Sequence, residues 1–125
     1  MLILGIALAG AVGALSRWGL AQLMLRWGGA SLPYGTLSAN LIGCLLLGVV
    51  MGLSERARWM GGELRVVITV GFIGTLTTFS TWEYETYRMA RRGDVLLAAG
   101  NFAVNVVLGF SLLWLGGRLV ALLWR

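Results

Sequence analysis

Four long apolar stretches, separated by short polar or turn-rich segments, make up most of the chain. They cover about residues 2–26, 32–54, 62–90 and 94–123. Each has at least the roughly 20 residues that an α-helix needs to cross the hydrocarbon core of a bilayer. In lipid the backbone must pair its polar groups internally, and these stretches lack the alternating pattern of barrel strands. The pattern therefore predicts a single all-α domain of four transmembrane helices.

Composition supports the bilayer as the solvent. The 125 residues are 58% hydrophobic and 12% charged, with a mean hydropathy of +0.84, whereas a soluble domain carries about 25% charged residues. We expect a multi-pass protein of the plasma or inner membrane. Four spans with short loops use up this length, which argues against a separate catalytic domain, so we expect no enzyme.

The net charge of +5 comes from ten arginines and five acidic residues, without lysine or histidine. Most arginines lie where apolar stretches end, which favours juxtamembrane anchoring over nucleic-acid binding. The absence of histidine removes the commonest metal ligand and general base. A lone Cys44 excludes an intrachain disulfide and a cysteine metal cluster.

The arginines give almost no signal for orientation. With four spans, both termini and the second loop share one side of the membrane. Five arginines fall on that side and four on the other, and the bias of short loops in Lys and Arg sets topology. We therefore expect insertion in both orientations and an antiparallel, dual-topology homodimer; a single fixed orientation is the alternative.

Small residues recur at four-residue spacing in the first two stretches: Gly5, Ala9 and Gly13, then Gly48 and Gly52. Such spacing lets helix backbones approach closely in lipid. Four short helices barely enclose a pore alone, which also favours a homo-oligomer.

The third stretch contains an unusual polar cluster at residues 71–82, with two glycines and five hydroxyl side chains. Glycine lowers helix propensity, and Ser and Thr compete for backbone hydrogen bonds. We expect a helix break near residues 74–78, whose freed carbonyls can bind a small cation. The alternative is an unbroken helix in which the hydroxyls bond back to their own carbonyls.

Side-chain amides lie inside two other stretches. Thr36 and Asn40 are four residues apart and share a helix face, and Asn101 and Asn105 repeat that spacing. Intramembrane polar groups are costly unless paired and face the bundle interior. They are either contacts between helices or a polar conduction track.

A track of this composition suits a small anion. It offers amide and hydroxyl donors together with the positive ring edges of Phe79 and Trp82, three residues apart. Conduction needs binding that is favourable but weak, and uncharged donors provide that. Arg17 could raise the local anion concentration at a vestibule.

At these residues the sequence resembles the CrcB/Fluc family of fluoride channels. Residues 10–17 (GAVGALSR) are similar to the family's G-x-x-G-A-x-x-R, residues 35–43 (GTLSANLIG) to G-T-L-x-x-N-x-x-G, and residues 71–81 (GFIGTLTTFST) to G-F-x-G-x-x-T-T-F-S-T. The length and the four spans agree as well, so the resemblance covers the whole chain.

The resemblance implies a passive channel that exports fluoride down its electrochemical gradient, with two pores in an antiparallel homodimer. It also implies a central structural Na⁺ held by the backbone carbonyls of Gly74 and Thr77. The pore and fluoride residues that match or neighbour the family's motifs are Phe79, Trp82, Asn40, Thr36, Ser80, Thr81, Asn101, Asn105, Arg17 and Glu85.

The chain departs from the family pattern at two positions. Trp82 stands where a second Phe is usual, and Asn101 stands near a usual Tyr. Glu83 has no assigned role.

One alternative function is a proton-coupled small multidrug exporter, which needs an acidic residue in an early membrane span, but nothing acidic precedes Glu55. A non-transporting membrane assembly subunit is the other, and it leaves the Ser/Thr cluster unexplained.

Overall fold

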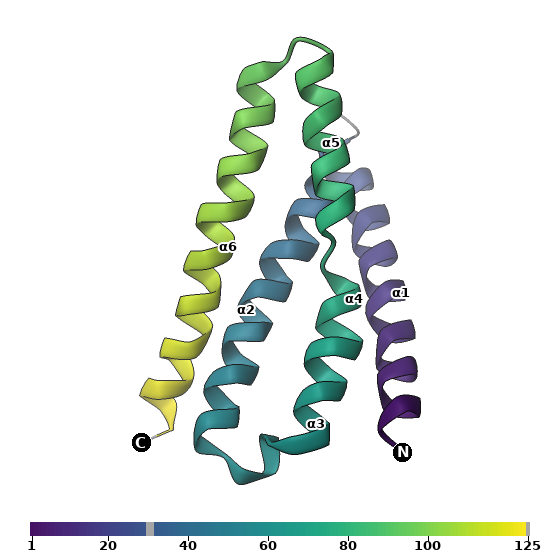
Figure 1. Cartoon of the computed structure of the whole chain (residues 1–125). Helices are drawn as coiled ribbons and strands as arrows, with labels where there is room; N and C mark the ends of the chain where they lie inside the picture. The colour runs from purple at the N-terminus through teal and green to yellow at the C-terminus, as the bar shows by residue number, and fades with distance from the viewer. Residues whose placement is uncertain (30–31, 125) are drawn as a thin grey trace.

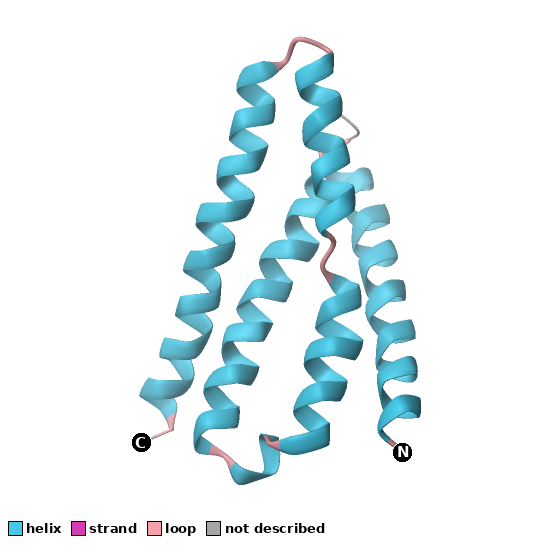
Figure 2. Cartoon of the chain, in the orientation of Figure 1, coloured by secondary structure: helices cyan, strands magenta, loops and turns pink. Residues whose placement is uncertain are grey.

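The computed structural model describes residues 1–29 and 32–124, which form helices joined by short turns (Figures 1 and 2). The elements in chain order are α1 (Leu2–Gly28), α2 (Tyr34–Arg56), a 3₁₀ turn η1 (Arg58–Met60), α3 (Gly62–Val66), a π-helical stretch η2 (Val67–Ile73), α4 (Gly74–Leu76), α5 (Phe79–Arg91) and α6 (Val95–Leu123). Four helical segments are long and apolar enough to cross a membrane, the third being Gly62–Arg91. The predicted all-α architecture with four such segments is confirmed.

Among the residues that the structure describes, four arginines lie toward each end of the molecule. Both termini and the α2–α3 connection lie at one end, and the α5–α6 turn lies at the other (Figure 1). The first end has Arg56, Arg58, Arg65 and Arg118, and the second has Arg26, Arg88, Arg91 and Arg92. Arg125, which the sequence count includes, lies outside the described residues.

The third segment departs from α-helical geometry twice along its length. It is π-helical over Val67–Ile73 and then α-helical to Leu76. Thr77 (φ −79°, ψ 155°) and Thr78 (φ −148°, ψ 118°) are extended, and Figure 2 shows this short connection between α4 and α5. The Thr78 hydroxyl accepts a hydrogen bond from the Thr81 N–H and caps the new helix. α5 therefore begins as a separately capped helix.

The close helix approach predicted at small residues is confirmed at both sites. A Cβ on Gly13 would overlap the Thr75 side chain and the Phe72 carbonyl, so α1 packs directly on the third segment. A Cβ on Gly48 would overlap the Leu113 carbonyl of α6, and Gly52 lies against Gly117. The missing side chains let the backbones meet.

Few large side chains are buried within one copy. Leu4 is 59% exposed and Phe110 is 75% exposed, and similar apolar side chains cover most of the outer surface. An apolar surface of this extent suits lipid and a membrane-embedded partner rather than water.

Candidate functional site

Asn40 of α2 holds the extended connection between α4 and α5. Its Oδ1 accepts the Thr78 N–H at 2.8 Å, and its Nδ2 donates to the Thr78 carbonyl at 3.3 Å. A continuous helix would give the Thr78 N–H to the Gly74 carbonyl four residues earlier. The Asn40 amide replaces that partner, which releases the Gly74 carbonyl from this bond and keeps buried Thr78 satisfied.

The Asn40 amide continues into a chain of hydrogen bonds along α6 and back to α5. Asn40 Nδ2 donates to Asn105 Oδ1 at 3.0 Å, and Asn105 Nδ2 donates to the Asn101 carbonyl at 3.0 Å and to Asn101 Oδ1 at 3.3 Å. Asn101 Nδ2 donates to Thr86 Oγ1 at 2.8 Å, and this hydroxyl donates to the Trp82 carbonyl at 2.7 Å. We call this set the amide chain: Asn40, Asn105, Asn101 and Thr86.

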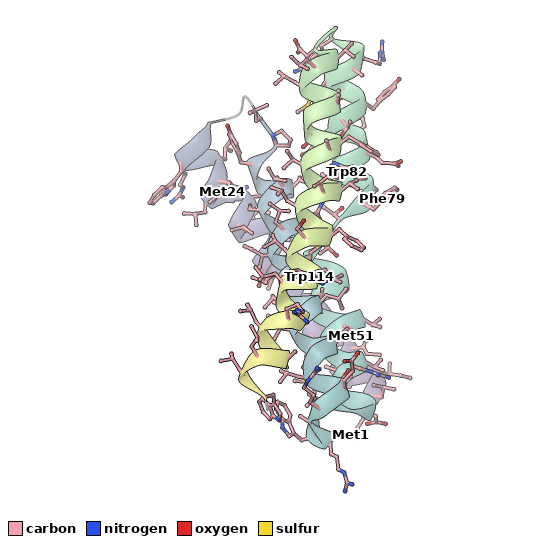
Figure 3. The ribbon with its side chains drawn as sticks, turned by 90° about the vertical axis from the view of Figure 1, so that its left-hand side faces the viewer. Met1, Met24, Met51, Phe79, Trp82 and Trp114 are labelled. Carbon is pink, nitrogen blue, oxygen red and sulfur yellow. The ribbon has the colours of Figure 1, made fainter. Side chains whose placement is uncertain are left out.

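Aromatic rings lie beside the amide chain, among them those of Phe79 and Trp82, which Figure 3 labels. The Trp82 ring is 5.4 Å from Phe79 at a tilt of 60°, and it is stacked 5.3 Å from Phe102 of α6. Its Nε1 donates to the Asn101 carbonyl at 3.4 Å. The two departures from the family pattern, Trp82 and Asn101, are therefore in contact. Trp82 is only 7% exposed, whereas Phe79 is 67% exposed.

Two open grooves meet at the Phe79–Trp82 pair. One of about 290 Å³ also contains Asn40, Thr78 and Asn105. The other, of about 890 Å³, contains Ser80, Thr86 and Phe102. Because both grooves share the two rings, the rings lie between them.

Thr36 and Glu85 form a second polar contact, between α2 and α5. The Thr36 hydroxyl donates to Glu85 Oε1 at 3.0 Å. Glu85 Oε2 is buried without a hydrogen-bond partner in the described part of the chain. Both residues line a pocket of about 360 Å³ that also holds Arg88 and Arg92. This pocket is separate from the amide chain.

The remaining hydroxyls fall into two groups. The Thr77 hydroxyl bonds back to the Ile73 carbonyl at 3.0 Å, as the alternative for this cluster expected. The Thr75 hydroxyl lies 2.7 Å from the Gly71 carbonyl and also 3.0 Å from the Gly10 carbonyl of α1, so it links two helices. Ser80 and Thr81 are exposed at the start of α5. Neither hydroxyl donates a hydrogen bond within residues 1–29 and 32–124.

The structure brings five of the ten predicted residues together. Asn40, Asn105, Asn101, Trp82 and Phe79 form one site. Arg17 is half-buried on α1, and the described residues provide it with no ion pair.

Sequence reasoning missed Thr86 and Phe102 as members of the site. Thr86 lies one helical turn after Trp82, and Phe102 follows Asn101 directly. Those spacings were the only signals available. The described residues contain no group of His, Cys, Asp or Glu side chains that could hold a metal ion.

Comparison with known proteins gives the chain its family. The family described as "CrcB-like protein, Camphor Resistance (CrcB)" matches residues 4–117. The chain belongs to this family. Curated CrcB relatives named "Fluoride-specific ion channel FluC" include those of Geobacter metallireducens (43% identical, 91% of this chain and 92% of the relative), Geobacter sp. strain M21 (47%, 89% and 90%) and Citrifermentans bemidjiense (45%, 89% and 90%). With its four apolar helices, this CrcB-family chain is a multi-pass membrane protein.

Proposed function

We propose that this CrcB-family protein is a passive, fluoride-selective channel that lets fluoride leave the cell down its electrochemical gradient. The observation that carries the proposal is the 43–47% identity, over about nine-tenths of both chains, to relatives named fluoride-specific ion channels. The site supports it with uncharged donors beside aromatic rings. Nothing in this arrangement calls for a chemical reaction, so no enzymatic step is proposed.

The proposed pathway runs along the two grooves and past the Phe79–Trp82 pair. Ser80 and Thr81 offer hydroxyl donors, and exposed Phe79 offers the positive edge of its ring. Thr36 and Glu85 mark a polar mouth, and Arg17 would attract anions nearby. Neutral donors bind a small anion weakly enough to release it, as conduction requires.

We further propose that two antiparallel copies enclose two such pathways. Phe79, Ser80 and Thr81 are exposed in one copy, so a second copy is needed to close the grooves. The nearly even arginine counts of the two sides, five and four in the full sequence, support insertion both ways up. In this proposal the Thr77–Thr78 connection is a break within the membrane, which is tolerated where it lines a cavity or is buried in protein.

A central structural Na⁺ fits the residues present. Its ligands would be the backbone carbonyls of Gly74 and Thr77 from both copies. Gly74 is exposed, its carbonyl is released from the Thr78 N–H, and Thr77 is extended. Carbonyl oxygens at interrupted helices are suitable Na⁺ ligands. The ion would hold the two connections together.

Ion efflux from liposomes that contain the reconstituted protein tests the proposed function. We expect fluoride efflux through the protein to be much faster than chloride efflux, and Phe79→Ile to slow fluoride efflux about fivefold, since a ring edge contributes roughly 1 kcal/mol. Phe110→Ile, on an exposed ring of α6, is the matched control and should leave efflux unchanged. Equal fluoride and chloride rates would contradict the proposal.

Replacing Na⁺ by K⁺ at constant ionic strength tests the ion and the dimer. A ligand at about 100 times its Kd stabilises the folded state by about 2.7 kcal/mol, so we expect a lower unfolding temperature and a larger monomer fraction in K⁺. Both are measurable in detergent by thermal unfolding and size-exclusion chromatography. Identical unfolding and elution in the two salts would remove the sodium site from the proposal.

A further inference from the structure

The orientation of the Asn40 amide is set by a single backbone group. The Thr78 N–H can only donate, so the Asn40 oxygen must face it, and it does at 2.8 Å. The Asn40 nitrogen then carries two N–H groups. One points to the Thr78 carbonyl at 3.3 Å and the other to Asn105 Oδ1 at 3.0 Å. Both donors of Asn40 are therefore used within the chain.

The same logic fixes the next amide. Asn105 must turn its oxygen toward Asn40, because the reverse orientation would set one NH₂ group against another. Its nitrogen then faces Asn101, where it donates to the backbone carbonyl at 3.0 Å and the side-chain oxygen at 3.3 Å. One continuous series of donations therefore runs from the Thr78 N–H through the amide chain to the Trp82 carbonyl.

We propose that Asn105 is a positioning residue, which acts on the pathway through Asn40 and does not bind the ion itself. It supplies the acceptor for the second Asn40 N–H. That bond holds Asn40 against Thr78 and so places Phe79, the next residue, at the start of α5. An amide N–H left unpaired in a low-dielectric interior is costly, so the Asn40 amide would otherwise turn away from Thr78. The inference rests on the proposed channel function.

Asn105→Leu in the full chain tests this assignment, because Leu keeps the approximate size and removes the hydrogen bonds. Two measurements are needed: hydrogen exchange at the Thr78 amide and fluoride efflux from liposomes. We expect exchange at Thr78 to quicken about tenfold and efflux to slow about tenfold, as for the loss of one hydrogen bond of a buried group. Ser111→Ala is the control on the same helix, because its hydroxyl bonds, among the described residues, only to the Val107 carbonyl.

The double variant separates positioning from ion contact. If Asn105 acts through Asn40, adding Asn105→Leu to Asn40→Ala slows efflux no further than Asn40→Ala alone. Additive losses with unchanged Thr78 exchange would mean that Asn105 touches the ion, which overturns the proposal. Faster Thr78 exchange without slower efflux would also overturn it, because the effect of Asn105 on Thr78 would then not matter for fluoride passage.

A folding failure and a failure of the channel hypothesis remain distinguishable. If Asn105→Leu does not insert, Asn105→Ala makes the same comparison with a smaller side chain. If the unmodified protein conducts no fluoride, the channel hypothesis fails, and the role of Asn105 in ion passage is overturned with it. Thr78 exchange would still show whether Asn105 orders Asn40.

Discussion

Asn40→Ala is expected to slow fluoride efflux about a hundredfold while the four helices still insert. The substitution leaves both the N–H and the carbonyl of Thr78 without their side-chain partner and strands Asn105 Oδ1. Two buried polar groups that lose their partners cost about 1–3 kcal/mol each, and each 1.4 kcal/mol is a factor of ten in rate. Efflux from liposomes at matched protein density measures the effect.

Ser38→Ala provides the matched control for this prediction. Ser38 lies on the same helix. Within the part of the chain that the structure describes, its hydroxyl bonds only to carbonyls of that helix, Tyr34 at 2.6 Å and Gly35 at 3.1 Å. We expect it to leave efflux unchanged. Rapid efflux through well-folded Asn40→Ala would show that the Thr77–Thr78 connection does not need this amide, and would remove Asn40 from the pathway.

The polar site could be predicted from the sequence only in part. An asparagine inside an apolar stretch must be paired, so Asn40, Asn101 and Asn105 were expected to face the bundle interior, and each bonds to a residue of another helix. The hydrogen-bond partners of these asparagines depend on how the helices pack. The Asn40–Thr78 hydrogen bond joins residues 38 positions apart, and the Trp82–Asn101 hydrogen bond joins α5 to α6. No local pattern encodes either contact.

The geometry of the third segment could likewise be predicted from the sequence only in part. Glycines and hydroxyls predicted a local departure from the α-helix, and the extended residues are Thr77 and Thr78. The π-helical stretch Val67–Ile73 was not predicted. It lies where Gly71 meets the Ile6 carbonyl and Ala9 of α1, at 2.9 Å and 2.8 Å from an added Cβ. The π-helical geometry thus coincides with a contact between two helices, which local helix propensity does not encode.

Gly116→Ala is expected to destabilise the fold even though alanine is the better helix former. A Cβ on Gly116 would overlap the Leu45 carbonyl and lie 2.8 Å from the Val49 nitrogen. These are backbone atoms of α2, so relief requires the two helices to separate. Overpacking typically costs 1–3 kcal/mol, which exceeds the gain of up to about 1 kcal/mol from helix propensity. Thermal unfolding in detergent measures the difference.

Gly100→Ala makes the same chemical change on the same helix, where an added Cβ meets nothing within 4 Å. It should raise the unfolding temperature slightly through the better helix propensity of alanine, so the two variants should shift that temperature in opposite directions. Such a contrast would show that glycine is needed on α6 for the approach of α2 and not for helix flexibility. Equal shifts would contradict this, and the α2–α6 contact would then not depend on Gly116. Because α6 carries Asn101 and Asn105, loss of this contact should also move these two side chains away from Asn40 and slow fluoride efflux.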